Sequence, residues 1–186
     1  MKIYKHTLFL LLGLGLFMAS CSKDDPEVEN EEEVITTLRY TLSPSDGGDD
    51  VVLSFVDLDG DGGDDPVITG GTLSANTTYS GSITILNEQE SPAEDITEEI
   101  EEEDEEHQFF FSTTVAGLSV AYNDTDADGN PIGLSSNLTT GEAGAGTLTV
   151  TLRHEPDKSA TGVSDGDIAN AGGETDIEVS FSIVVE

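Results

Sequence analysis

The stretch that decides the fold is IEVSFSIVV, residues 177–185. Apolar side chains stand at every second position of this stretch, and glutamate, serine and one valine lie between them. Such alternation is typical of a β-strand with one buried and one solvated face, whereas a helix repeats its apolar positions every three or four residues. The C-terminal segment therefore predicts a strand of a β domain.

The same alternation recurs along the rest of the chain. It is found at residues 34–42, 51–58, 79–85, 109–115 and 148–152, with shorter candidates at 118–122 and 132–138. The segments between these stretches are rich in Gly, Asp, Ser and Pro, which are turn formers. One buried face per strand is the pattern of antiparallel sheets packed face to face. We therefore expect a mainly β chain, an immunoglobulin-like antiparallel β-sandwich of seven or eight strands over residues 34–186.

One segment, SPAEDITEEIEEEDEEH at residues 91–107, breaks the alternation. Ser91 is placed to cap a helix, Pro92 suits its first position, and Glu94 completes a capping box. Ile96 and Ile100 lie four residues apart, which puts them on one helical face. The sequence predicts one short acidic helix over residues 92–104.

The composition limits the possible functions. The chain has 186 residues, enough for one domain, and 39 acidic against 6 basic residues give a formal net charge of -33. Such a charge repels nucleic acid and anionic membrane surfaces and favours cations as partners. No glycine-rich phosphate loop and no GxSxG motif occurs in the sequence, so we expect a protein that is not an enzyme.

Residues 1–20 have the features of an export signal. Lys2 and Lys5 precede an apolar stretch at residues 8–18, and two small residues lead into Cys21. The stretch is shorter than the about 20 apolar residues that a membrane-spanning helix needs. We therefore predict that residues 1–20 are a cleaved signal peptide.

The run FMASC resembles the lipobox of bacterial lipoproteins, in which the cysteine is acylated and becomes the first residue. This resemblance implies that Cys21 carries the lipid anchor. The next residues, beginning SKDD, resemble the acidic stretch of surface-displayed lipoproteins in Bacteroidota. Residues 21–33 are polar and acidic and predict a flexible tether. The expected location is the outer membrane, lipid-anchored, with the domain exposed at the cell surface.

Eight of the nine residues from Glu98 to Glu106 are acidic, and His107 follows them. Like charges four residues apart destabilise a helix, and a bound cation would relieve that repulsion. Imidazole beside carboxylates suits zinc or copper better than calcium. If the strand ends meet at one pole, a joint site could include His154; the candidate ligands are Glu102, Glu103, Glu106, His107 and His154. The alternative interpretation of the acidic run is a solvated loop that keeps the protein soluble.

Two loops have acidic residues at alternate positions before a glycine, as calcium loops do. The first contains Asp57, Asp59 and Asp61, and its sequence fits a calcium site and a turn equally well. The second contains Asp124, Asp126 and Asp128, for which we expect a hairpin turn. Neither loop has the glutamate that completes an EF-hand.

Four stretches, VITTLRYTL, LDGDGGDDPVITGGTL, ILNEQESPAEDITEEIEEEDEEHQFFF and GGETDIEVSFSI, are similar to a family of small flavobacterial lipoproteins. Members are often labelled type 1 periplasmic binding fold proteins, a label that implies two α/β lobes and no established activity. The residues instead predict one β domain, because they offer one helix and turn-connected strands.

Together these features give two hypotheses from different classes. The first is a surface lipoprotein whose acidic pole binds a divalent metal ion (zinc, copper or calcium) and delivers it to an outer-membrane transporter. The second is a non-catalytic adhesion or interaction module in which the acidic run only solvates the surface.

Overall fold

The structure is a computed structural model that describes residues 34–60 and 63–186. It is mainly β with one α-helix, as the alternation predicts. The signal peptide and the tether predicted for residues 1–33 lie outside the described residues. No helix in the described ranges has the length and apolar content that a membrane crossing requires.

The strands are β1 (Thr37–Pro44), β2 (Val51–Val56), β3 (Val67–Thr69), β4 (Gly71–Leu73), β5 (Thr78–Asn87), β6 (Glu94–Asp95), β7 (His107–Thr113), β8 (Ser119–Tyr122), β9 (Ser135–Thr139), β10 (Gly144–His154) and β11 (Glu174–Val185).

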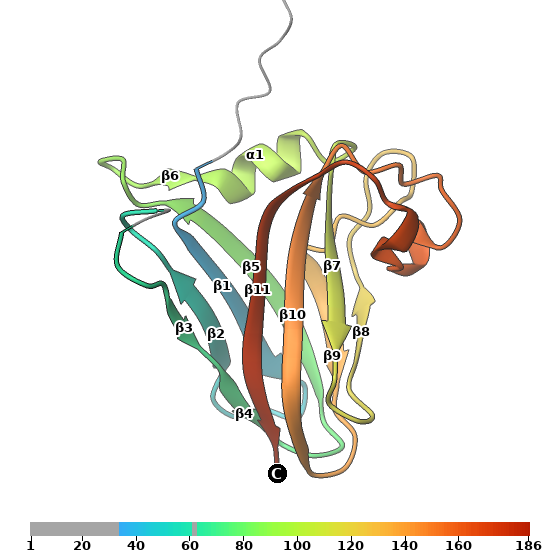
Figure 1. The fold of residues 1–186 in the computed structure, drawn as a ribbon. Coiled ribbons are helices and arrows are strands. Elements are labelled where there is room, and N and C mark those ends of the chain that lie inside the picture. Colours follow the sequence, from blue (N-terminus) through green and yellow to red (C-terminus); the bar gives the residue numbers. More distant parts are fainter. Residues whose placement is uncertain (1–33, 61–62) are drawn as a thin grey trace, which may run out of the picture. The chain divides into compact units, whose positions relative to one another are not determined.

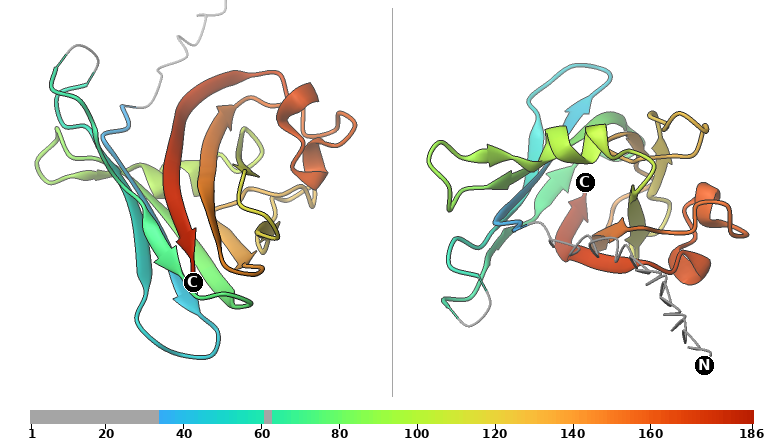
Figure 2. Two further views of the ribbon diagram at one scale, coloured as in Figure 1. Left: turned by 60° about the horizontal axis from the view of Figure 1, so that its bottom comes forward. Right: turned by 90° about the horizontal axis from the view of Figure 1, so that it is seen from above.

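The strands form two sheets that face each other (Figures 1 and 2). One sheet has the order β3-β2-β1-β5-β9-β8, with β6 paired to β5, and the other has the order β4-β11-β10-β7. A single large apolar core lies between them, because alternate residues of each strand point inward. Its fully buried large side chains come from both sheets and include Leu38, Tyr40, Leu53, Ile85, Phe109, Leu148 and Phe181.

The eight stretches that alternate in the sequence all become strands: β1, β2, β5, β7, β8, β9, β10 and β11. The sequence did not predict β3, β4 and β6, which have two or three residues each, too few to show a period. The immunoglobulin-like connectivity stays a prediction. The described fold is a two-sheet β domain, and it does not have the two α/β lobes that the periplasmic-binding label implies.

One pair departs from the antiparallel rule, since β4 runs parallel to β11. The chain passes from β3 in one sheet to β4 in the other with only Gly70 between them, so β4 keeps the direction of β3. A Cβ atom at Gly70 would lie 2.0 Å from the carbonyl oxygen of Ser182. Only glycine allows so close an approach of two backbones at this corner.

The helix α1 (Ile96–Glu102) starts four residues later than predicted. Glu94 and Asp95 pair with β5 instead of entering the helix, so Pro92 is not its first residue and Ser91 is not its cap. Asp95 caps it, because its carboxylate accepts a hydrogen bond of 3.1 Å from the amide of Thr97. The prediction that Ile96 and Ile100 share a buried face is confirmed, and α1 lies across one end of the two sheets (Figure 1).

Candidate metal centre

His107 and His154 are direct neighbours on adjacent strands. His107 is the first residue of β7, His154 is the last residue of β10, and the two are paired in register. Each histidine belongs to the inward-facing row of its strand. His107 is in the same row as Phe109 and Phe111 on β7, and His154 is in the same row as Leu152 on β10. The two imidazole rings stack with centroids 4.7 Å apart and an angle of 27° between their planes. Both residues are buried, with 0% and 7% of their surface exposed.

The α1–β7 turn fixes the orientation of the His107 ring. Nδ1 of His107 lies 3.2 Å from the carbonyl oxygen of Glu103. A carbonyl oxygen only accepts, so this hydrogen bond requires the proton on Nδ1 and leaves the lone pair of a neutral ring on Nε2. A hydrogen bond from one ring nitrogen to a backbone carbonyl is the usual support of a histidine that ligates a metal through the other.

Asp176 joins the histidines because of a β-bulge. Leu152 of β10 pairs with Ile177 of β11, but the next residue, Arg153, pairs with Thr175, so Asp176 is an extra residue in β11. A bulge changes the direction in which a side chain points. The Asp176 side chain is 3% exposed, and its Oδ1 lies 4.0 Å from Nδ1 of His154. His107, His154 and Asp176 each offer one ligand atom, and these three atoms lie within 4.8 Å of one another.

The chain just before Asp176 is held in place from the neighbouring strand. Arg153 donates hydrogen bonds to the carbonyl oxygens of Gly172 and Gly173 and to the hydroxyl of Thr175. Gly173 has a φ of 65°, and a Cβ atom there would lie 2.1 Å from the carbonyl oxygen of His154. The backbone that leads into the bulge therefore touches the backbone of the candidate ligand.

Two exposed carboxylates lie beside the buried group. Glu106 precedes β7, Glu155 follows β10, and the Glu155 amide donates a hydrogen bond of 2.6 Å to the Glu106 carbonyl oxygen. Oε2 of Glu106 lies 3.9 Å from Nε2 of His154. Glu106, His154 and Glu155 form a second group whose ligand atoms lie within 4.8 Å of one another. His154 belongs to both groups.

A buried ion pair connects the segments around this centre. Lys158, in the connection between β10 and β11, donates a hydrogen bond of 3.0 Å to Oδ2 of Asp126 and another to the carbonyl oxygen of Asp104. The two side chains are 5% and 1% exposed. Burial raises the pKa of the Asp126 carboxyl, but hydrogen bonds from Lys158 and Asn130 and the charge of Lys158 lower it more, so the pKa lies below its ordinary value.

The rest of the β10–β11 connection covers the outer face of β7. It contains two short 3-10 helices, Val163–Asp165 and Ile168–Asn170. Val163 and Ala171 pack against Phe110 of β7 in a second apolar cluster. Gln108 donates a hydrogen bond of 2.9 Å to the carbonyl oxygen of Val163. Both faces of β7 are therefore covered next to His107.

The structure places the other predicted ligands differently. Glu102 and Glu103 are exposed, and neither carboxylate belongs to the two groups. The helix ends at Glu102, so only Glu98 and Glu102 form a like-charge pair four residues apart inside it. The helix thus contains fewer like-charge pairs at this spacing than the sequence implied. The carboxylate of Glu106, a member of the same run, lies 3.9 Å from Nε2 of His154.

Aspartates of both loops accept hydrogen bonds from nearby backbone amides. Oδ1 of Asp57 accepts a hydrogen bond from the Gly60 amide and Oδ2 of Asp59 accepts one from the Asp64 amide, while Asp61 lies outside the described residues. In the second loop, Asp126 accepts hydrogen bonds from the amides of Asp128 and Asn130, as expected for a turn. No aspartate of the described parts of these loops belongs to either metal-like group.

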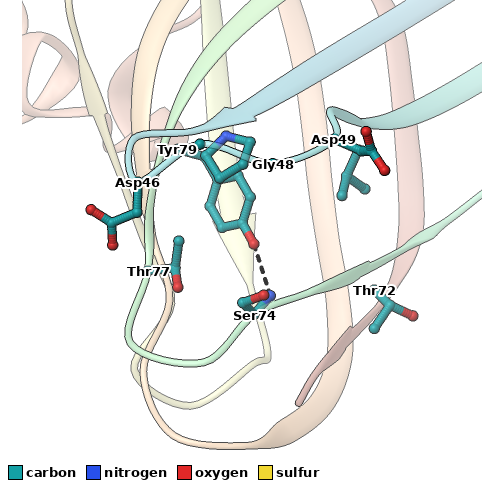
Figure 3. Close-up of a pocket in the computed structure, with 10 residues that line it drawn as sticks. Asp46, Gly48, Asp49, Thr72, Ser74, Thr77 and Tyr79 are labelled. Carbon is teal, nitrogen blue, oxygen red and sulfur yellow. Dashed lines mark hydrogen bonds between the residues drawn. The ribbon is translucent and has the colours of Figure 1, made fainter.

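A polar pocket of about 250 Å³ lies between the β1–β2 turn and the strands β4 and β5 (Figure 3). The hydroxyl of Tyr79 accepts a hydrogen bond of 2.7 Å from the amide of Ser74 at its wall. The carboxylates of Asp46 and Asp49 lie on opposite sides of the pocket and point away from each other (Figure 3). They do not converge on a common ion.

Comparisons of the chain with known protein families, with curated proteins and with solved structures found no match. Sequence reasoning missed Asp176 and Glu155 as candidate ligands. By alternation Asp176 falls on the solvated face with Glu178 and Ser180. The alternating pattern contains no signal for the inward direction of this side chain.

Proposed function

We propose that this protein is a lipid-anchored surface protein whose β domain binds a transition-metal ion through His107, His154 and Asp176. The observation that carries the proposal is the convergence of two buried imidazoles and one buried carboxylate at the same end of β7, β10 and β11. Two nitrogens and one oxygen are a ligand set that zinc uses in sites with an open fourth position. Copper also accepts imidazole, whereas calcium prefers a shell of oxygens.

The geometry requires a small contraction on binding. Zinc lies about 2.0 to 2.2 Å from nitrogen and oxygen ligands, so ligand atoms around a tetrahedral ion are about 3.3 Å apart. The present atoms lie within 4.8 Å. Rotation of the His154 and Asp176 side chains would bring the nitrogens and the oxygen to this spacing. The carboxylate of Asp176 supplies negative charge that partly balances a dication.

Metal titration with thermal unfolding tests the proposal. We expect zinc and copper(II) to raise the melting temperature, because an ion that binds only the folded state stabilises it by about 2.7 kcal/mol at a free concentration 100 times its Kd. Calcium at the same millimolar concentration is the matched control and should leave melting unchanged. An unchanged melting temperature with zinc and with copper would exclude the metal function.

The attachment rests on Cys21 and the lipobox-like run before it. We expect replacement of Cys21 by Ala to move the protein from the membrane fraction to the soluble fraction of cells, because two or more acyl chains are needed for lasting attachment. Fractionation and immunoblotting measure the change, and replacement of Ser22 by Ala is the control. Retention of Cys21→Ala in membranes would contradict lipidation. An anchored, surface-exposed ion binder would serve to supply an outer-membrane transporter.

A second candidate function is a non-catalytic interaction module. It is favoured by exposed apolar side chains on and beside the edge strand β3 and its neighbour β2: Val52, Leu58, Val67 and Ile68 are 42% to 65% exposed. Apolar side chains that gather on a surface often mark a contact with a partner. The metal titration separates the two, since an interaction module gains no stability from zinc or copper.

A further inference from the structure

The buried ligands need a route from solvent. His107 is 0% exposed, and the side chains of His154 and Asp176 are 9% and 3% exposed. An ion cannot reach such atoms without first meeting groups at the surface. Two exposed carboxylates lie next to this buried group. They belong to Glu106 and Glu155, which form a second group with His154 in the described part of the chain.

The ring of His154 faces both groups. Its Nε2 lies 3.9 Å from the exposed carboxylate of Glu106, and its Nδ1 lies 4.0 Å from the buried carboxylate of Asp176. Nδ1 is buried and has no hydrogen-bond partner among the described residues. An imidazole nitrogen in this position, more than nine-tenths buried and beside a carboxylate, is suited to a cation.

The backbone holds the two exposed carboxylates at this place. The hydrogen bond from the Glu155 amide to the Glu106 carbonyl oxygen ties the start of β7 to the end of β10. Glu155 has a φ of 49°, in the left-handed region that side chains rarely adopt. Both side chains therefore leave the backbone directly beside His154.

The two groups differ in the ligands that they offer. The outer group has two exposed carboxylates beside one buried imidazole, so an ion bound there keeps part of its hydration shell and is held weakly. The inner group has two imidazoles and a carboxylate in a buried setting, where attraction to a cation is screened less. An ion that arrives at the outer group therefore gains affinity by moving inward.

We propose that Glu106 and Glu155 form the entrance through which a metal ion reaches His107, His154 and Asp176. This inference rests on the metal-binding function proposed above. The ion first binds the two exposed carboxylates with Nε2 of His154, and rotation of that ring then passes it to the inner ligands. Release follows the same path in reverse.

Stopped-flow kinetics with cobalt(II) test the entrance, because the visible absorption of this ion reports nitrogen and oxygen ligands. Association is followed after mixing with the ion and dissociation after mixing with excess EDTA. We expect the double variant Glu106→Gln, Glu155→Gln to lower both rate constants about tenfold, because charged groups at a binding site raise association rates by at least that factor. Kd is the ratio of the two rate constants and should stay nearly unchanged. The matched control is Glu102→Gln, Glu103→Gln, which removes the same charge from the neighbouring turn.

The possible outcomes lead to different conclusions. Equal slowing in both double variants would overturn the entrance, because the general negative field would then explain the rate. A higher dissociation rate alone would also overturn it and would make Glu106 or Glu155 a permanent ligand. Unchanged rates would overturn it and keep the metal function. Absence of cobalt binding to the wild-type protein would instead exclude both the function and the entrance.

Discussion

We expect that replacing Asp176 by Asn weakens the proposed zinc binding by about 10- to 100-fold or more, since even outer partners of metal ligands cause a loss of that size. The amide has the size of the carboxylate but no charge, so it neither binds a dication well nor balances its charge. Asp176 is the only carboxylate of the buried group, with Oδ1 4.0 Å from His154. Competition of the protein with a zinc indicator at fixed pH and ionic strength measures the change in Kd.

The control for this substitution is Glu178→Gln, two residues along the same strand. Glu178 is exposed, accepts a hydrogen bond of 3.1 Å from the Thr151 hydroxyl and belongs to neither metal-like group. The change from carboxylate to amide is the same, so an equal loss in both variants would mean that net charge alone attracts zinc. Urea unfolding without metal shows whether each variant is folded.

Replacing Lys158 by Met lowers the free energy of unfolding by about 3 to 5 kcal/mol, the cost of leaving one member of a buried ion pair without its partner. The Asp126 side chain is 1% exposed, and its lowered pKa means that the carboxylate is charged at neutral pH in the wild-type protein. The hydrogen bond from Lys158 to the Asp104 carbonyl oxygen is lost as well. Urea unfolding at pH 7 measures the difference.

Arg39→Met is the control, because Arg39 and Glu88 form an ion pair of 3.4 Å whose side chains are 39% and 30% exposed. An exposed pair contributes less than about 1 kcal/mol, so this variant should be close to wild type. An effect of Lys158→Met as small as this control would contradict the prediction. The double variant Lys158→Met, Asp126→Asn should recover part of the loss, since no buried charge is left unpaired.

The effect of Lys158→Met also depends on pH. The pKa of Asp126 is lowered in the folded protein, so its contribution is complete above the ordinary carboxyl value of about 3.9 and is lost as the pH falls through the lowered value. The stability difference between wild type and Lys158→Met should therefore be constant near neutrality and shrink below about pH 4. A difference that stays the same at pH 3 would mean that the Asp126 charge is not its cause.

The main strands could be predicted from the sequence because, in each of them, alternating apolar and polar residues indicate which face is buried. Residues 177–185 alternate over their whole length, and the structure buries Val179, Phe181, Ile183 and Val185. The crossing at Gly70 could not be predicted in this way, since β3 and β4 have three residues each. The start of α1 was missed because Glu94 and Asp95 pair with β5, a tertiary contact that overrides a local capping pattern.

The candidate centre was only partly accessible from the sequence. His107 and His154 stood out as the histidines beside strand ends, and pairing of β7 with β10 places them together. Glu102 and Glu103 were chosen from a charge run, but the chain turns after Glu102 and their carboxylates belong to neither metal-like group. Asp176 could not be found, because a bulge leaves no mark in an alternating pattern.

The bulge also bears on how such a protein could change over generations. A carboxylate that faces inward only because of one extra residue could be gained or lost through insertion or deletion of a single codon. The apolar rows of β10 and β11 would keep their pairing beyond that point. Closely similar chains could therefore share the entire scaffold and differ in whether they hold a metal at all.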